Sequence, residues 1–150
     1  MQVKLPLTYG DYRNIIKNFI YNQWQLQWSI FGTCRLKNFK PILGDWKSAY
    51  RDVRSEEKKL SRLRTGTCLF LKQHIFDPQK PRETCRSCNV NLSIKHIIID
   101  CPSLQNSRQR IIDYLNQRNL NLSEEVILCD AFPHGLLFAF LKETPFYRRI

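Results

Sequence analysis

Four side chains between residues 85 and 101 constrain the fold of this chain more than any other feature. Cys85, Cys88, His96 and Cys101 follow one another with the spacing Cys-x2-Cys-x7-His-x4-Cys. Two cysteines three residues apart can direct both sulfurs toward one ion, and the histidine and the third cysteine complete a set of four ligands. Sulfur and imidazole donors suit tetrahedral zinc, whereas calcium and magnesium need oxygen ligands. Since four protein ligands leave no position for water, the spacing predicts a structural zinc site.

The backbone between the last two ligands has to leave ideal helical geometry. On an α-helix, positions 96 and 101 point about 140° apart and cannot reach one ion. Pro102 disfavours helical torsions at Cys101, so we predict a short helix that is capped by Ser93 and unwinds before Cys101. On the face that would dock this unit on the rest of the fold, the helix carries three isoleucines: Ile94, Ile97 and Ile98.

The alternative to a metal site is a set of buried free cysteines beside a core histidine. The remaining cysteines, Cys34, Cys68 and Cys129, have no partner at ligand spacing and are predicted to be small buried hydrophobes. His74 is the reserve ligand should His96 point away.

Length and composition predict one globular domain over residues 1–150. The chain is 43% hydrophobic, and no apolar run approaches the 18 or more residues of a membrane span. No secretory signal begins the chain, so we expect an intracellular protein of the nucleus or cytoplasm, in which cysteines are thiols or metal ligands rather than disulfides.

The apolar periodicity predicts a mainly α fold, a small helical domain with a zinc-knuckle-like Cys-Cys-His-Cys insertion. Residues 1–79 form a helical part with a basic connector, residues 80–104 the zinc-knuckle-like unit, and residues 105–150 the C-terminal helices. Thr8 and Asp11 resemble a capping box before the first helix, whose apolar stripe runs from Tyr12 to Trp28. Trp46 and Tyr50 are expected to pin the connector to the core. Further helices are predicted near 55–66, 67–75, 104–119, 123–129 and 133–143.

Catalysis within this chain is not expected. The local motifs of hydrolases, zinc proteases, nucleotide-binding loops and dinucleotide-binding folds are all missing from the sequence. The acidic residues lie mostly beside basic residues or in predicted first turns, rather than in groups suited to acid–base work.

Positive charge indicates an anionic partner. The net charge is +11, and residues 35–64 alone carry +6. We expect non-specific binding of RNA or single-stranded DNA without membrane contact. Basic side chains and a few exposed aromatic rings can bind a strand without recognising its sequence. The alternative is a solvated basic face. The predicted phosphate contacts are Lys58, Lys59, Arg62, Arg64, Arg82, Arg86 and Lys95.

Several segments resemble, in order, one region of a known family. They are Trp24–Trp28 (WQLQW), Lys40–Trp46 (KPILGDW) with Tyr50 and Arg51, Glu56 and Glu57 followed by Leu60–Gly66 (LSRLRTG), the four-ligand segment ending His96–Pro102 (HIIIDCP), and Phe140–Lys142 with Tyr147–Ile150. Together they resemble the region that follows the reverse transcriptase and ribonuclease H domains in the polyproteins of Jockey-like non-LTR retrotransposons.

The resemblance implies a nucleic-acid-binding accessory module of a polyprotein whose RNA-directed DNA polymerase is not contained in these 150 residues. We therefore expect a truncated or orphaned fragment, and Thr67 stands where the family usually has histidine. Two alternatives remain: a zinc-stabilised docking module for the parent reverse transcriptase or a host factor, and a relic product without selected activity.

Overall fold

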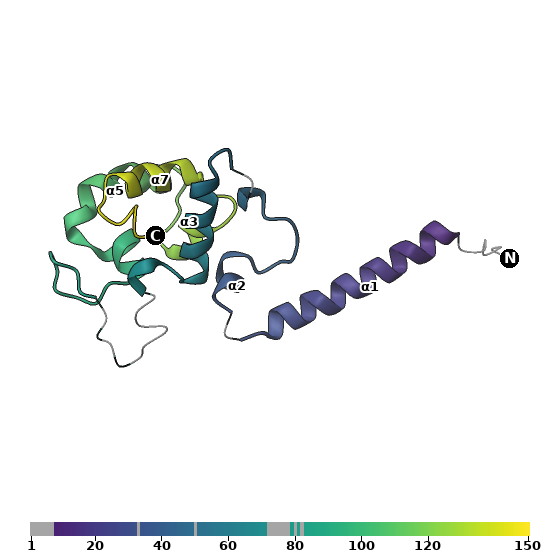
Figure 1. The fold of residues 1–150 in the computed structure, drawn as a ribbon. Helices are drawn as coiled ribbons and strands as arrows, with labels where there is room; N and C mark the ends of the chain where they lie inside the picture. The colour runs from purple at the N-terminus through teal and green to yellow at the C-terminus, as the bar shows by residue number, and fades with distance from the viewer. Residues whose placement is uncertain (1–7, 33, 50, 72–78, 80, 82) are drawn as a thin grey trace.

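The computed structural model describes residues 8–32, 34–49, 51–71, 79, 81 and 83–150, and it is mainly helical (Figure 1). Its elements are α1 (Tyr9–Ile30), α2 (Arg35–Phe39), η1 (Lys47–Ala49), α3 (Arg54–Thr65), η2 (His96–Asp100), η3 (Pro102–Leu104), α5 (Gln105–Asn116), α6 (Glu124–Leu128) and α7 (His134–Lys142). No described helix combines the length and hydropathy needed to cross a bilayer.

Helix α1 begins as predicted but is not part of the core. The Thr8 hydroxyl accepts from the Asp11 amide, and the Asp11 carboxylate accepts in return from the Thr8 amide, so the capping box is confirmed. The helix projects from the rest of the chain (Figure 1), and none of its residues is buried. The apolar stripe from Tyr12 to Trp28 therefore contains no buried residue, because periodicity selects a helix while burial needs a partner surface.

The connector after α1 is more ordered than its composition indicated. It contains the short helix α2, which buries Phe39, and the single 3₁₀ turn η1. Trp46 is half-buried and packs against the core as predicted, whereas Tyr50 lies outside the described residues.

Helix α3 confirms the predicted second helix, with Leu60 and Leu63 buried. It ends at Gly66, whose φ of 77° is left-handed and suits glycine at a helix C-terminus. Glu56, in its first turn, is buried and accepts from Arg51 and Lys142 at 2.8 Å each. Burial raises the pKa of this carboxyl, but the bonds from Lys142 and Arg51 outweigh it and hold the pKa below its ordinary value.

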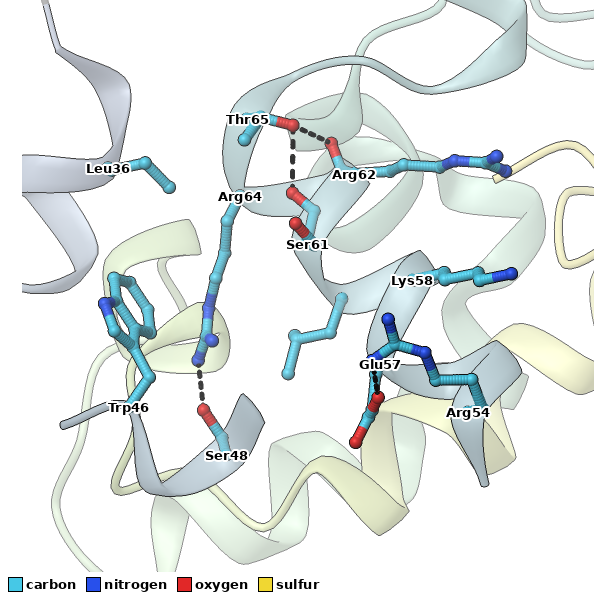
Figure 2. Close-up of a pocket in the computed structure, with 11 residues that line it drawn as sticks. Leu36, Trp46, Ser48, Arg54, Glu57, Lys58, Ser61, Arg62, Arg64 and Thr65 are labelled. Carbon is cyan, nitrogen blue, oxygen red and sulfur yellow. Dashed lines mark hydrogen bonds and ion pairs between the residues drawn. The ribbon is translucent and has the colours of Figure 1, made fainter. Parts of the chain in front are cut away.

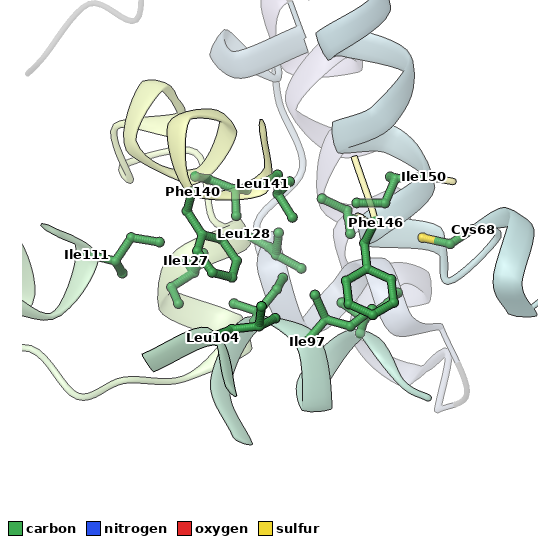
Figure 3. Close-up of a cluster of buried hydrophobic side chains, with 14 of the residues drawn as sticks. Cys68, Ile97, Leu104, Ile111, Ile127, Leu128, Phe140, Leu141, Phe146 and Ile150 are labelled. Atoms are coloured by element: carbon green, nitrogen blue, oxygen red, sulfur yellow. The ribbon is translucent and has the colours of Figure 1, made fainter. Parts of the chain in front are cut away.

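The core joins the C-terminal helices to the cysteine-rich segment. Figure 3 shows Ile111 of α5, Ile127 and Leu128 of α6, and Leu141 of α7 gathered around one cluster, with Ile97 from the segment before Pro102. Ile94, Ile97 and Ile98 are at most 4% exposed, so the predicted isoleucine face is confirmed. The predicted helices at 104–119, 123–129 and 133–143 are confirmed within a few residues. Of the one predicted at 67–75, residues 69–71 are helical and 72–75 lie outside the described residues.

Candidate metal centre

A tight turn positions the first two cysteines. An isolated antiparallel bridge pairs Thr84 with Asn91, and the Cys85 amide donates to the Val90 carbonyl at 2.8 Å. Between these contacts the Asn89 amide donates to the Cys85 carbonyl at 2.8 Å, and Asn89 has a φ of 53°. Asparagine tolerates this left-handed conformation better than most residues, so the turn closes with Cys85 and Cys88 on the same side.

A π-helical turn positions the other two ligands. The Ser93 hydroxyl accepts from the His96 amide at 2.9 Å, which is the predicted cap. The chain then winds as the π-helix η2, and the Cys101 amide donates to the His96 carbonyl at 2.7 Å. A bond across five residues places Cys101 above His96, whereas an ideal α-helix would direct the two side chains apart. Cys101 is extended, with φ −67° and ψ 114°, as expected before Pro102.

The four predicted ligands converge. Their donor atoms all lie within 4.8 Å of one another. The Cys101 Sγ atom is 3.9 Å from that of Cys85 and 3.7 Å from that of Cys88, well beyond disulfide length. Cys85, His96 and Cys101 are buried, and Cys88 is half-buried. Within the described part of the chain this is the single group of three or more such side chains arranged to hold a metal ion.

The electrostatics of the cluster favour a cation. Burial opposes ionisation of Cys85, but hydrogen bonding by His96 and by the amides of Ser87 and Cys88 lowers its pKa to about 6. Burial and the neighbouring thiols of Cys101 and Cys85 raise the pKa of Cys88 to about 11. The Nε2 atom of His96 is buried and has no hydrogen-bond partner among the described residues. A metal ion would stabilise the crowded thiolates and provide a partner for a histidine nitrogen, so these residues can hold one.

Arg108 of α5 secures the ligand-bearing backbone, a role that no motif signalled. It is 1% exposed, and its Nη2 atom donates to the carbonyls of Ile97 and Cys101 at 3.2 Å each. Burial lowers the pKa of this guanidinium, whereas Cys101 and Asp100 oppose that shift, and the two carbonyl acceptors offset part of the desolvation cost. Charge patterning of α5 alone would have placed this arginine on the helix surface.

The remaining cysteines and histidines lie outside this cluster. Cys68 is fully buried, as predicted, and burial raises its pKa to about 12, while Cys34 and Cys129 are half-buried. His134 begins α7 and is 4% exposed. The reserve ligand His74 lies outside the described residues.

The basic residues predicted on α3 have different environments. Lys58 is exposed to solvent. Lys59 donates to the Tyr147 carbonyl and lies 4.5 Å from the centre of that ring, and Arg62 donates to the main-chain oxygen of Ile150 at 2.6 Å. Lys59 and Arg62 therefore hold α3 against the last residues of the chain.

Arg64 is a structural residue, and its prediction as a phosphate contact is wrong. It is 4% exposed and donates to the Leu128 carbonyl and the Ser48 hydroxyl at 2.8 Å each. Figure 2 shows its side chain extending along a pocket of about 550 Å³ toward Ser48 and Trp46, and its guanidinium lies 4.2 Å from the Trp46 ring centre. The helical turn directs this arginine inward, where the Leu128 carbonyl, the Ser48 hydroxyl, the Asp130 carboxylate at 3.4 Å and an aromatic ring replace water.

Two predicted contacts lie beside the candidate metal ligands. Arg86 stands between Cys85 and Cys88, and Lys95 immediately precedes His96; both are exposed. Arg82 lies outside the described residues.

Comparisons of the chain with protein-family models, with curated proteins and with solved structures found no significant match.

Proposed function

We propose that this chain is a non-catalytic, zinc-stabilised module that binds RNA or single-stranded DNA without sequence preference. The observation that carries the proposal is the convergence of Cys85, Cys88, His96 and Cys101, with exposed basic side chains adjacent to them in sequence. A metal bound there would fix the backbone that carries these basic side chains.

Zinc is the metal that these donors favour. With a zinc–sulfur distance of about 2.3 Å, two sulfurs of a regular tetrahedron lie about 3.8 Å apart. The two sulfur–sulfur distances to Cys101, 3.9 Å and 3.7 Å, lie on either side of this value. Three thiolates and an imidazole fill a tetrahedral shell and leave no place for a catalytic water, so the metal would supply folding free energy rather than chemistry.

The charge balance supports an anionic ligand. A divalent cation with three thiolates carries a net charge of −1, and the buried guanidinium of Arg108 compensates for it from within the protein. Arg86 and Lys95 thus remain free to meet phosphates, together with Lys58 on α3. With about three phosphate contacts, the logarithm of affinity for a single strand should fall with the logarithm of salt with a slope near −2.

The proposed origin is the C-terminal region of a Jockey-like non-LTR retrotransposon polyprotein, and it rests on the ordered motifs of the sequence. The module would deliver nucleic acid to a polymerase that this chain does not contain.

Metal analysis of protein purified without added zinc tests the site. We expect one zinc ion per chain, and a Cys88→Ser variant should contain substantially less. A metal-free wild-type protein that stays fully folded would contradict the structural role of zinc.

A salt series tests the ligand. Binding of a fluorescent single-stranded RNA or DNA should weaken as salt rises, and the Arg86→Gln, Lys95→Gln double variant should reduce the slope by about 1.4, or 0.7 for each lost contact. Arg110→Gln is the matched control, because this exposed arginine already has a carboxylate partner in Glu143 at 4.0 Å. Undetectable or salt-independent binding would contradict the proposal and favour the protein-docking alternative.

A further inference from the structure

Among the described residues, helix α1 is attached to the rest of the chain along one side. Tyr21 Oη donates to the Leu43 carbonyl at 2.9 Å, and Trp28 Nε1 donates to the Lys40 carbonyl at 2.9 Å. Gln25 accepts from the Leu43 amide at 2.8 Å through its side-chain oxygen. At about 100° per residue, positions 21, 25 and 28 fall within an arc of about 60°. This arc is the face of α1 that contacts its own chain.

The opposite face carries an apolar seam. Residues 9, 12, 16, 19, 23, 26 and 30 alternate in steps of three and four, which is the heptad spacing of a coiled coil. Their mean direction lies about 180° from the attached face. Six of the seven are large apolar side chains that are 53% to 84% exposed: Tyr9, Tyr12, Ile16, Phe19, Leu26 and Ile30. The seventh is Gln23. We call these seven residues the α1 seam.

We propose that the α1 seam binds the α1 seam of a second copy of this chain, forming an antiparallel two-helix coiled coil. The area is sufficient for such a dimer. Side chains of this size lose roughly 100 Å² each when such exposed fractions are covered. When Ile16 faces Phe19 of the second copy, Ile30 lies beyond the end of the second α1, so five from each copy bury roughly 1,000 Å² in total, which meets the roughly 1,000 Å² expected of a specific interface.

The charge distribution favours a second copy over an anionic surface. Arg13 and Lys17 are the basic residues of α1, and neither belongs to the seam. Helices that lie on anionic membranes carry many basic residues, and a phosphate backbone needs them within reach. With Asp11, the helix has a net charge of only +1, so two copies of α1 repel each other weakly.

The charge on the rest of the chain favours the antiparallel orientation. The chain carries +11 and residues 1–34 carry +2, so residues 35–150 carry +9. A parallel pair would place two such bodies at the same end of the coil, whereas an antiparallel pair separates them along a helix roughly 33 Å long. The 22 residues of α1 provide this length.

The polar seam residue selects a register. In an antiparallel pair, Ile16 can face Phe19 of the second copy, and this register places Tyr12 opposite Gln23. The tyrosine hydroxyl can then bond the glutamine amide, which an apolar partner would leave unsatisfied. Shifting the register by one heptad would place Gln23 opposite Phe19.

Sedimentation of the full, zinc-loaded chain tests the interface. We expect a dimer at about 100 µM chain, and Ile16→Glu should weaken dimerisation at least about tenfold by burying a charge in the seam. Asn14→Glu adds the same charge to the same part of α1 on the opposite face and should leave the dimer intact. Because α1 contributes no buried residue, both variants should retain their zinc and the fold of residues 35–150, as checked by metal content and circular dichroism.

A charge pair tests orientation and register. Tyr12→Glu alone should weaken the dimer, and adding Gln23→Lys should restore it, because each glutamate then faces a lysine of the second copy. In a parallel coil the double variant would juxtapose like charges and dissociate further. A monomeric wild-type chain at about 100 µM, or a dimer that Ile16→Glu leaves intact, would overturn the proposal. Failure of the double variant to recover would overturn the antiparallel register.

Discussion

Replacing Arg108 by methionine should weaken both the fold and the metal site. Methionine fills most of the volume of the lost side chain but supplies no donor to the carbonyls of Ile97 and Cys101, each 3.2 Å from Nη2. Hydrogen bonds from a charged donor contribute about 1.5–3 kcal/mol each, so the two bonds represent about 3–6 kcal/mol. Removing the buried guanidinium also removes its desolvation cost, and this offsets part of the loss of the two hydrogen bonds. We expect the free energy of unfolding to fall by about 3 kcal/mol.

The same change should lower zinc affinity by about 10- to 100-fold, because Arg108 holds the backbone at one ligand and beside another. Competition against a chromophoric chelator measures the affinity, and denaturant titration of the zinc-loaded protein measures the stability. Arg110→Met is the matched control, because it removes an arginine from the same helix whose side chain is 72% exposed. If the two variants bound zinc equally well, Arg108 would stabilise only the core, and the reasoning about the ligand backbone would be refuted.

Three further predictions concern the ligands, pH and one turn. Cys88→Ser should loosen the knuckle as chelation does, measured by hydrogen exchange, whereas Cys129→Ser should cost less than about 1 kcal/mol; equal effects would contradict the ligand assignment. Burial, with help from nearby arginines, lowers the pKa of His134 to about 4. Its contribution to stability is therefore complete above the unfolded pKa of about 6.5 and is lost as the pH falls toward 4. The stability difference between wild type and His134→Gln should accordingly shrink by about 3 kcal/mol over that window, and a constant difference would exclude the effect. Gly66→Ala should destabilise by about 1 kcal/mol, because φ is 77° there, although the added carbon meets only the Arg35 side chain at 3.6 Å. Gly135→Ala, within α7 and with open space around it, should instead be neutral or stabilising, and equal losses from both glycine variants would count against the strain argument.

Local features of the chain were predictable because their causes are local. The Thr8 and Asp11 side chains cap α1 through partners three residues apart, and Gly66 ends α3 through its own torsion angle. The four ligands were readable for a similar reason, since they lie within 17 residues and two short turns bring them together. The π-helical route from His96 to Cys101 was not predicted, because a proline indicates only that helical torsions end and not how the preceding turn winds.

The direction of the arginines required the tertiary structure. Arg64 and Arg108 belong to helices whose sequences contain many charges, and both are at most 4% exposed. Their bonds go to carbonyls that lie 64 residues away for Arg64 and up to 11 for Arg108. Residue type alone predicts that such arginines are exposed to solvent, because it does not show which distant carbonyls can accept their hydrogen bonds.

By itself, the sequence determined the helical class, the helix boundaries at their caps, the four candidate ligands and the basic charge, since each depends on neighbours within one or two turns. Only the tertiary structure decided which apolar stripes are covered and which arginines are buried. The stripe of α1 and the isoleucines before Cys101 are both amphipathic patterns, yet one is exposed and the other forms part of the core. Burial is a property of two surfaces, and one segment of sequence describes only one of them.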